Sequence, residues 1–223
     1  SNIMLNELDK ELESRGQRFT RYADDVIIVL KSKAAATRVM YSITSWIERK
    51  LGLKVNATKT KITPPSKLKY LGFGFWKGKE GWKARPHESS VEKFKRKLKK
   101  LCKRSWSVDL TCRIKKINEV TRGWINYFKI GSMKGLCERL DSNIRYRLRM
   151  CIWKHWKTPQ NRARNLIKLG ISKKFAWSTA YYGAHIAHVC QGGAMNMAVT
   201  KERLTRFGLV SMADYYAERR VTC

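Results

Sequence analysis

Two adjacent aspartates, Asp24 and Asp25, interrupt an apolar and β-prone run that extends from Phe19 to Leu30. Ionised carboxylates repel each other, and partial removal from water further destabilises their charged forms. The pattern predicts a strand, a tight turn that carries both aspartates, and a second strand. A plain polar turn is one interpretation, because Asp favours turns. A metal site is the other, because Mg²⁺ binds through one or two carboxylates together with the phosphates of a substrate.

Charge is distributed unevenly along the chain. The 223 residues include 48 Lys and Arg against 17 Asp and Glu, which gives a formal net charge of +31. Residues 1–30 hold four basic and six acidic side chains, so the whole basic excess lies in residues 31–223. Such an excess opposes compaction and attracts a polyanion. We therefore expect a nucleic acid partner, bound with a steep dependence on salt. A structural RNA-binding protein accounts for this charge but not for the aspartate pair.

Several classes of protein are disfavoured by what the sequence lacks. No apolar stretch approaches the roughly 18 residues of a membrane span, and no signal peptide is visible. The six cysteines form no Cys-x-x-Cys pair, which indicates a reducing, cytoplasmic environment without structural disulfides. His185, His188 and Cys190 lie close together but lack a second ligand pair at zinc-site spacing. We expect no membrane partner, and the sequence does not define an oligomeric state.

The first of three expected parts, residues 1–85, mixes helices with short strands. Helical periodicity alternates with β-prone runs, which predicts an α+β arrangement. Helices are expected over 3–13 and 34–51, and strands over 19–30, 53–62 and 68–76.

The second part, residues 86–158, is helical and strongly basic. Apolar residues recur at helical spacing in three stretches, joined by connections at 105–110 and 131–133, which predicts a bundle of three antiparallel helices. The third part, residues 159–223, is expected to be a small, mostly helical domain. Its helices are expected near 160–169, 172–182 and 211–220, with a break at Gly192-Gly193.

Basic residues gather on helix faces away from the apolar stripes of the second part. A run of one sign, with almost no acid beside it, indicates a surface that contacts phosphates. The candidate nucleic-acid contacts are Lys93, Arg96, Lys97, Lys99, Lys100, Lys103, Arg104, Arg145, Arg147, Arg149, Lys154 and Lys157.

The motifs of the first part, in their order, resemble those of reverse transcriptases encoded by group II introns. Tyr22-Ala23-Asp24-Asp25 resembles the active-site motif, and the segment Ser1–Asp9 resembles the one that follows the Gln-Gly template-clamping motif. Leu51–Asn56 with Lys59–Lys61 resembles the next motif, and Tyr70–Phe73 resembles the turn that grips the primer. The first part is therefore expected to be the C-terminal portion of a polymerase palm.

The resemblance continues through the rest of the chain. Arg122–Phe128, Arg145–Arg149 and Trp153–Lys157 resemble the thumb, or maturase, domain of the same family. The closest type is the compact bacterial one, in which a small DNA-binding domain follows the thumb and no endonuclease follows that. We accordingly find no Cys/His cluster of nuclease type before Cys223.

The resemblance assigns roles to individual residues. Asp24 and Asp25 would be ligands of a two-Mg²⁺ site, where the metals activate the primer 3′-hydroxyl and stabilise the leaving pyrophosphate. Tyr22 would lie beside the primer terminus. Lys59 would lie near the incoming triphosphate and offset its charge.

A turn at Tyr70, Leu71 and Gly72 would hold the primer strand, with Gly72 permitting close backbone approach. The alternative for Leu71 and Gly72 is a tight β-turn that serves the fold alone. Enzymes of this family also need a third carboxylate on an upstream strand, and Asp9 lies in a helical pattern that does not suit this role. We therefore expect a fragment that lacks the fingers and the upstream catalytic aspartate, and that does not polymerise alone.

The function implied by the resemblance has two sides. The protein would copy RNA into DNA during retrohoming, and it would bind its own intron RNA to assist splicing. Its partners would be group II intron RNA, an RNA template with a DNA primer, deoxynucleoside triphosphates and target DNA. Two alternatives remain, a non-catalytic RNA-binding splicing factor and a diversity-generating or defence-associated reverse transcriptase. The thumb signature Gly123-Trp124-x-Asn126-Tyr127-Phe128 argues against the latter.

Overall fold

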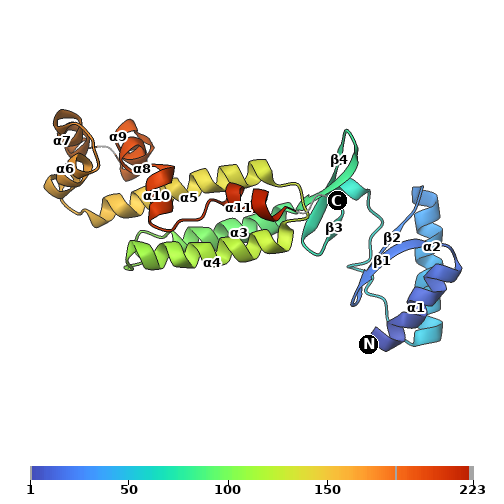
Figure 1. Cartoon of the computed structure of the whole chain (residues 1–223). Helices are drawn as coiled ribbons and strands as arrows, with labels where there is room; N and C mark the ends of the chain where they lie inside the picture. Colours follow the sequence, from blue (N-terminus) through green and yellow to red (C-terminus); the bar gives the residue numbers. More distant parts are fainter. Residues whose placement is uncertain (1, 184, 221–223) are drawn as a thin grey trace. The chain divides into compact units, whose positions relative to one another are not determined.

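The computed structural model describes residues 2–183 and 185–220. Ser1 and Cys223, named above, lie outside the described residues. The chain is mostly helical with small antiparallel sheets, so the expected α+β class is confirmed. Two compact units divide at Tyr70 and Leu71, and each is described by itself (Figure 1).

The first unit, up to Tyr70, places two helices against a β-hairpin (Figure 1). The hairpin and both expected helices are confirmed. Its elements are α1 (Asn2–Ser14), β1 (Arg18–Tyr22), β2 (Asp25–Val29), α2 (Lys33–Trp46), a π-helical turn (Ile47–Leu51), a 3₁₀ turn (Pro65–Lys67) and β3 (Lys69–Tyr70).

A small apolar core holds the first unit together. Leu8 and Leu12 of α1 pack with Ile43 of α2, and these three residues are 6% exposed or less. Phe19 and Ile28 of the hairpin pack against the same cluster. Burial of a side chain of this size contributes about 1.5–3 kcal/mol. The core therefore fixes the hairpin to the helices through one of its two faces.

One strand expected in this unit is absent, and another is divided. Residues 53–62 form no strand, because the Asn56 side chain accepts hydrogen bonds from the backbone N–H groups of Thr58 and Lys59, both at 3.1 Å. Such a turn offers the backbone partners that a strand would otherwise supply. The run over 68–76 is interrupted at Leu71 and Gly72, where φ is +49° and +80°. Positive φ at two successive residues is incompatible with extended backbone.

The second unit, from Leu71 onward, begins with a β-hairpin and continues as helices (Figure 1). The three helices expected in residues 86–158 are confirmed, whereas β5 and the short helices α8, α9 and α10 were not anticipated. The elements are β4 (Phe73–Gly78), β5 (Gly81–Pro86), α3 (Glu88–Leu101), α4 (Leu110–Phe128), α5 (Lys134–His155), α6 (Pro159–Lys168), α7 (Lys173–Tyr181), α8 (Ile186–Gln191), α9 (Gly193–Ala198), α10 (Lys201–Arg206) and α11 (Met212–Arg219).

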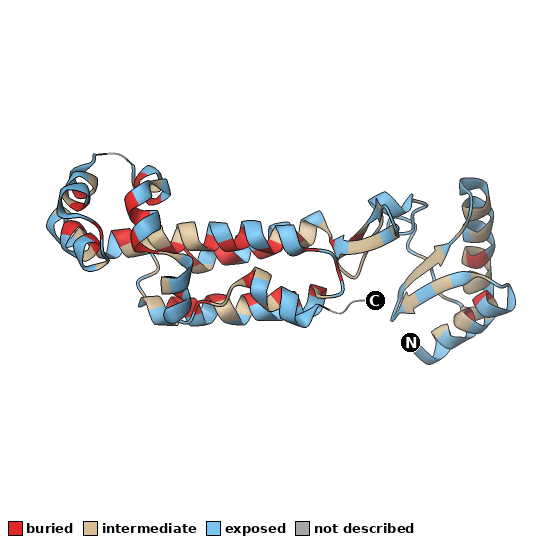
Figure 2. Ribbon diagram, turned by 45° about the horizontal axis from the view of Figure 1, so that its top comes forward, coloured by how far each residue is buried: buried red, intermediate tan, exposed pale blue. Residues whose placement is uncertain are grey.

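One apolar core runs through the second unit. Buried residues follow one side of each long helix, with exposed residues on the other (Figure 2). Leu98 of α3, Ile117 of α4 and Leu148 of α5 are all 4% exposed or less. The same cluster includes Met195 of α9 and Tyr216 of α11. The late helices therefore share the core of the long ones.

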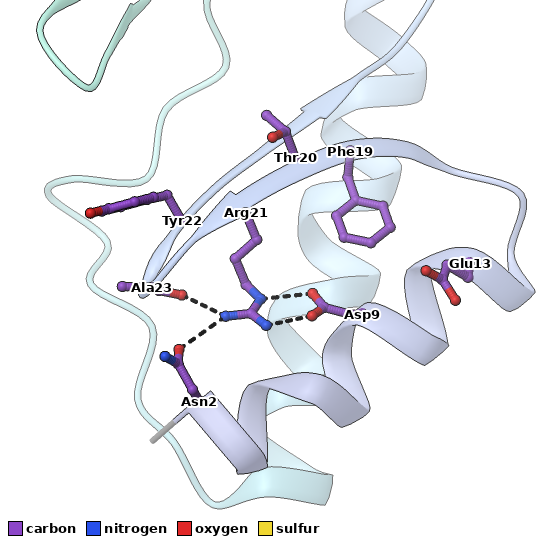
Figure 3. A pocket seen from close by; sticks show the side chains of 8 residues that line it. All are labelled: Asn2, Asp9, Glu13, Phe19, Thr20, Arg21, Tyr22 and Ala23. Atoms are coloured by element: carbon purple, nitrogen blue, oxygen red, sulfur yellow. Dashed lines mark hydrogen bonds and ion pairs between the residues drawn. The ribbon is translucent and has the colours of Figure 1, made fainter. Parts of the chain in front are cut away.

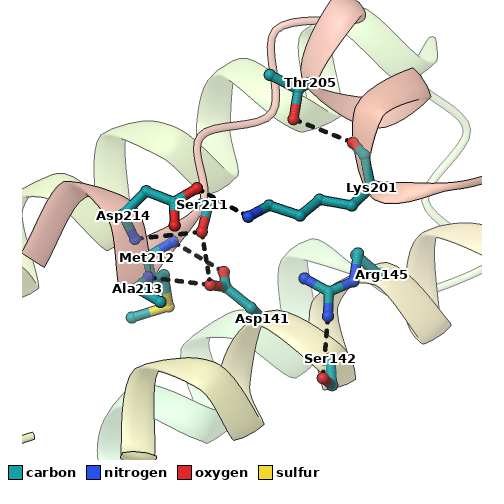
Figure 4. A network of polar contacts seen from close by, with 9 residues as sticks. All are labelled: Asp141, Ser142, Arg145, Lys201, Thr205, Ser211, Met212, Ala213 and Asp214. Carbon is teal, nitrogen blue, oxygen red and sulfur yellow. Dashed lines mark hydrogen bonds and ion pairs between the residues drawn. The ribbon is translucent and has the colours of Figure 1, made fainter. Parts of the chain in front are cut away.

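A buried carboxylate attaches α11 to α5. Asp141 is 5% exposed and accepts hydrogen bonds from the Ser211 hydroxyl (3.0 Å) and from the backbone N–H groups of Met212 (2.8 Å) and Ala213 (3.0 Å) (Figure 4). These N–H groups belong to the first turn of a helix, where no intrahelical partner exists and a negative charge is favoured. Asp141 thus determines where α11 begins against the long helices.

No helix in residues 2–183 and 185–220 has the length and hydropathy of a membrane span.

Candidate catalytic hairpin and nucleic-acid interface

The pairing register of the β1–β2 hairpin gives it two chemically different faces. Phe19 pairs with Ile28 and Arg21 with Val26, so these side chains share the face toward the helices. Tyr22 pairs with Asp25 on the opposite face, where Tyr22 is 64% exposed. The apolar core of the first unit therefore does not cover the face that carries Tyr22 and Asp25.

Both aspartates lie at the tip of this hairpin. The turn has Ala23 and Asp24 as its central residues, and Asp25 is the first residue of β2. Ala23 has φ of +54°, a left-handed conformation that costs a non-glycine residue about 1–2 kcal/mol. Asp24 and Asp25 are both exposed, and neither takes part in an ion pair within residues 2–183 and 185–220.

Arg21 holds the turn in place from the other face. Its guanidinium forms a two-pronged ion pair with the carboxylate of Asp9 on α1, with Nε donating to Oδ1 at 2.7 Å and Nη2 donating to Oδ2 (Figure 3). Nη1 donates to the Ala23 carbonyl at 2.9 Å and to the Asn2 side chain at 3.2 Å. The same cation thus connects the helix to the strained residue of the turn. This arrangement stabilises the strained backbone beside Asp24.

The Arg21 ion pair lies in an open cavity of about 790 Å³ beside the hairpin. Asn2, Asp9, Glu13 and residues 19–23 line it (Figure 3). The hydrogen bonds from Arg21 hold the pKa of Asp9 below its ordinary value, partly offset by burial. Asp9 is therefore engaged by Arg21 on the face opposite Tyr22 and Asp25.

The two exposed aspartates fit the coordination chemistry of Mg²⁺. Carboxylate oxygens are the hard ligands that this ion prefers, and it retains water and substrate phosphates as further ligands. Within the described part of the chain, no group of three or more His, Cys, Asp or Glu side chains is arranged to hold a metal ion. The hairpin presents two exposed carboxylates, which are donors of the kind that Mg²⁺ prefers.

Two further candidates of the first unit lie outside the hairpin. Lys59 is exposed in the Asn56 turn, where its backbone N–H donates to the Asn56 side chain at 3.1 Å. Tyr70 lies in β3, and its hydroxyl is 3.5 Å from the carbonyl oxygen of Asp25. Among the contacts within the described part of the chain, Tyr70 has a polar contact with Asp25 and Lys59 has none with either aspartate.

The Leu71–Gly72 turn belongs to the second unit. A Cβ atom added at Gly72 would lie 3.1 Å from the Ser90 hydroxyl and 3.3 Å from the ring of Phe128. Gly72 is therefore required both by its positive φ and by the close approach of α3 and α4.

The candidate cations of α3 and its C-terminal connection are on the surface. Phe94 and Leu98 point into the core, while all seven basic candidates of this stretch are exposed. Lys95 is the one basic residue of α3 that has an ion-pair partner within the described residues, namely Glu92 at 2.9 Å. The seven exposed candidates are Lys93, Arg96, Lys97, Lys99, Lys100, Lys103 and Arg104.

Each of the three candidate arginines of α5 donates a hydrogen bond to another residue of the protein. Arg145 donates to Ser142 at 3.0 Å, and Arg147 donates to Asn143 at 2.9 Å. Arg149 donates to the Val199 carbonyl at 3.0 Å, and burial lowers its pKa. Arg149 therefore contributes to packing between α5 and the segment after α9. Lys154 and Lys157 are exposed at the end of α5.

Two known families match the chain in the expected order. Reverse transcriptase (RNA-dependent DNA polymerase) matches residues 1–75, which contain the hairpin. The maturase-specific domain of group II introns matches residues 91–170, which contain α4, α5 and α6. The chain belongs to the group II intron reverse transcriptase/maturase family. A search of curated proteins gave no match.

In this member of the reverse transcriptase/maturase family, Arg21 supports the turn that carries the aspartates, and the sequence did not lead us to expect it. Arg21 alternates in phase with Phe19, so it is a charged residue on the apolar face of a strand. A charge at such a position requires a partner, because an unpaired buried charge is costly. The alternation therefore indicates that Arg21 needs an ion-pair partner, although it does not identify Asp9 of α1 as that partner.

Proposed function

We propose that this chain is the palm-and-thumb part of an RNA-directed DNA polymerase that copies RNA into DNA in retrohoming and binds its intron RNA to assist splicing. Residues 1–85 would form the C-terminal part of the palm, 86–158 the thumb and 159–223 a DNA-binding domain. The observation that carries this proposal is the hairpin tip. Asp24 and Asp25 are exposed there without an ion-pair partner in the described residues, while Arg21 secures the turn from the other face.

Asp24 and Asp25 are proposed as metal ligands of a two-Mg²⁺ site. When bound, Mg²⁺ would activate the primer 3′-hydroxyl and offset the charge of the leaving pyrophosphate. The protein would contribute by holding two oxygen donors at a fixed position before any substrate arrives. The bracing of Ala23 by Arg21 supports that role, since a fixed turn loses little entropy on binding the metal.

Other residues of the proposed site would orient the substrates. Tyr22 presents an exposed ring beside the aspartates, on which the primer terminus would rest. Lys59 would approach the triphosphate of the incoming deoxynucleotide and offset its charge. The turn at Leu71 and Gly72, together with Tyr70, would hold the primer strand of the RNA–DNA duplex.

Iron-directed cleavage tests the metal assignment on the chain itself. Fe²⁺ that replaces Mg²⁺ reduces added hydrogen peroxide to hydroxide and a hydroxyl radical, ascorbate regenerates the Fe²⁺, and the radicals cut the backbone next to the site. We expect cleavage around Asp24 in the wild type and its loss in Asp24→Asn. Glu48→Gln removes one negative charge from an exposed position outside the hairpin and should leave the cleavage unchanged. Equal cleavage in the wild type and Asp24→Asn would refute the metal site.

Primer extension tests the enzyme assignment. Because Asp9 is engaged by Arg21, we propose that the 223 residues alone do not extend a primer. In a polypeptide that adds the upstream part of a reverse transcriptase palm, Asp24→Asn should abolish DNA synthesis and leave intron RNA binding intact. Synthesis that survives this substitution would favour the non-catalytic splicing factor instead.

Binding of intron RNA is proposed for the exposed basic surface of α3. Cations on this face have few acidic neighbours, which supports contact with phosphates. Target DNA would be bound by residues 159–223. Preference for the intron over an unrelated structured RNA of equal length, maintained at high salt, is the expected result for recognition by this part of the protein.

A matched pair of triple variants separates these phosphate contacts from total charge. Lys93→Gln, Lys97→Gln and Lys100→Gln together remove three exposed charges of α3 and should reduce the salt slope of RNA binding by about three. The control variant removes three lysines that are already paired with Glu80, Glu92 and Glu119, and it should change the slope far less. Its substitutions are Lys83→Gln, Lys95→Gln and Lys116→Gln. Equal slopes in the two variants would show that α3 is only a solvated face.

A further inference from the structure

The turn at Leu71 and Gly72 has a backbone that local sequence does not favour. Leu71 has φ of +49°, a left-handed conformation that a leucine rarely adopts. Gly72 follows with φ of +80°. A strained conformation at a non-glycine residue persists only where the surrounding structure holds it. The contacts that hold this turn come from helices far away in the sequence.

Both carbonyl groups of the turn accept hydrogen bonds from residues of α3, of α4 and of the segment that precedes α3. The Leu71 carbonyl accepts a hydrogen bond from the Tyr127 hydroxyl of α4 at 2.9 Å. The Gly72 carbonyl accepts from the Ser90 hydroxyl of α3 at 2.9 Å and from the His87 backbone N–H at 2.8 Å. The orientation of each peptide unit in the turn is thus determined by the helices.

The Tyr127 ring is placed by aromatic contacts rather than by burial. It remains 56% exposed, yet it stacks on Phe73 with a centroid separation of 5.9 Å and meets Phe128 edge-on at 4.7 Å. Phe73 and Phe128 are themselves in edge contact at 4.9 Å. Offset and edge-to-face pairs of this kind fix ring geometry. The hydroxyl is therefore aimed at the Leu71 carbonyl by three rings in mutual contact.

We propose that Tyr127 is a positioning residue for the turn that holds the primer, so that helix α4 determines where the primer-contacting backbone lies. The inference rests on the proposed function, because it assumes that the Leu71–Gly72 turn touches the primer strand. Tyr127 acts through Leu71 and need not contact the nucleic acid itself. Loss of its hydroxyl frees one peptide unit of a strained turn without removing a core side chain.

Photocrosslinking tests this proposal on the chain as it stands. A DNA primer with 4-thiothymidine at its 3′ end is annealed to an RNA template, bound and irradiated, and crosslinks to residues 71–73 are measured by mass spectrometry. We expect Tyr127→Phe to lower the crosslink yield per bound complex about fivefold, the effect of one lost hydrogen bond. Duplex affinity should remain within about twofold of the wild type, because the phosphate contacts that supply most affinity are untouched.

Tyr215→Phe is the matched control. Its hydroxyl donates to the Asn126 side chain at 3.2 Å, one residue from Tyr127, and does not touch the turn. The control should retain the wild-type yield. Ser90→Ala should lower the yield through the Gly72 carbonyl, and Ser90→Thr, which keeps the hydroxyl, should restore it.

The remaining outcomes decide against the proposal in distinguishable ways. A wild-type crosslink to residues 71–73 that is unchanged in Tyr127→Phe overturns the positioning role and leaves the proposed function standing. Weaker binding of the variant with an unchanged yield per complex assigns Tyr127 to general structure and overturns it as well. Absence of the crosslink in the wild type refutes primer contact by the turn, and the inference falls with that part of the proposed function.

Discussion

Arg21 and Asp9 form an ion pair that connects the helix-facing side of the β1–β2 hairpin to helix α1. The guanidinium presents two parallel N–H groups to one carboxylate and uses its third nitrogen on the Ala23 carbonyl (Figure 3). The side chains that face away from this pair are Tyr22 and Asp25. A single ion pair thus supports the turn without occupying the face proposed for chemistry.

Replacement of Arg21 by Lys should loosen the hairpin although the charge is kept. Lysine supplies a point charge, whereas the arginine fork reaches both Asp9 oxygens and the Ala23 carbonyl at once. We expect faster amide hydrogen exchange across β1 and β2. Arg18→Lys, at an exposed position of the same strand, is the control and should exchange like the wild type. Equal protection in all three proteins would remove Arg21 from the support of the turn.

Acid should weaken the contribution of Asp9 to stability. Its pKa is lowered in the folded state by the hydrogen bonds from Arg21, so the unfolded chain takes up the proton first as pH falls. The contribution is complete at neutral pH and is lost as pH drops below about 4, the ordinary pKa of Asp, toward the lower folded value. Denaturant unfolding at pH 7 and pH 3 measures this. The stability difference between wild type and Asp9→Asn should shrink at pH 3, and a constant difference would contradict the assignment.

Ala23→Gly should stabilise the first unit. Glycine relieves a left-handed strain of about 1–2 kcal/mol and costs about 0.5–1 kcal/mol in backbone entropy. The net gain in free energy of unfolding should therefore be about 0.5–1 kcal/mol. Urea unfolding provides the measurement. Ala34→Gly, near the start of α2, has no such strain to relieve and should destabilise. A loss of stability in Ala23→Gly would show that the turn is not strained.

Asp141→Asn should release α11 from the long helices. The carboxylate accepts three hydrogen bonds, whereas an amide presents an NH₂ group to donors that it cannot satisfy (Figure 4). We expect a loss of about 1–3 kcal/mol and early proteolytic cleavage near Ser211. Asp214→Asn breaks the exposed ion pair with Lys201 and should cost less than about 1 kcal/mol. Equal losses in the two variants would rule out a special role for Asp141.

Cysteine reactivity should report on the core of the second unit. Burial raises the pKa of the Cys102, Cys137 and Cys190 thiols to about 12, and the thiolate is the reactive form. Iodoacetamide at pH 8 should therefore leave these three unmodified in the folded protein and modify them after denaturation, as measured by peptide mass spectrometry. Among the five cysteines that the structure describes, Cys112 is only half-buried and should react first. Rapid labelling of Cys137 in the folded state would show that the core opens readily.

The sequence by itself determined the longer helices and the first hairpin, but not every short element. Apolar residues at helical spacing predicted α1, α2 and the three long helices, because a helix buries one stripe wherever its packing partner lies. The β-prone run around Asp24 and Asp25 predicted the hairpin for a similar reason, since strand, turn and strand are adjacent in the chain. The family resemblance rested on the same short motifs. The roles of the candidate site residues remain predictions, including those of Asp24, Asp25, Tyr22, Lys59, the Tyr70–Gly72 turn and the basic residues.

Only the tertiary structure decided which distant residues meet. Arg21 needed a partner by its position in the strand, but nothing local selected Asp9. The Tyr127 hydroxyl reaches a carbonyl 56 residues away, and Asp141 accepts hydrogen bonds from a helix about 70 residues later. Such contacts depend on how the packed helices bring separate segments together, whereas periodicity reports only the neighbours of each residue along the chain. The two strained turns are therefore readable as turns from sequence, while the residues that hold them are visible only in the folded protein.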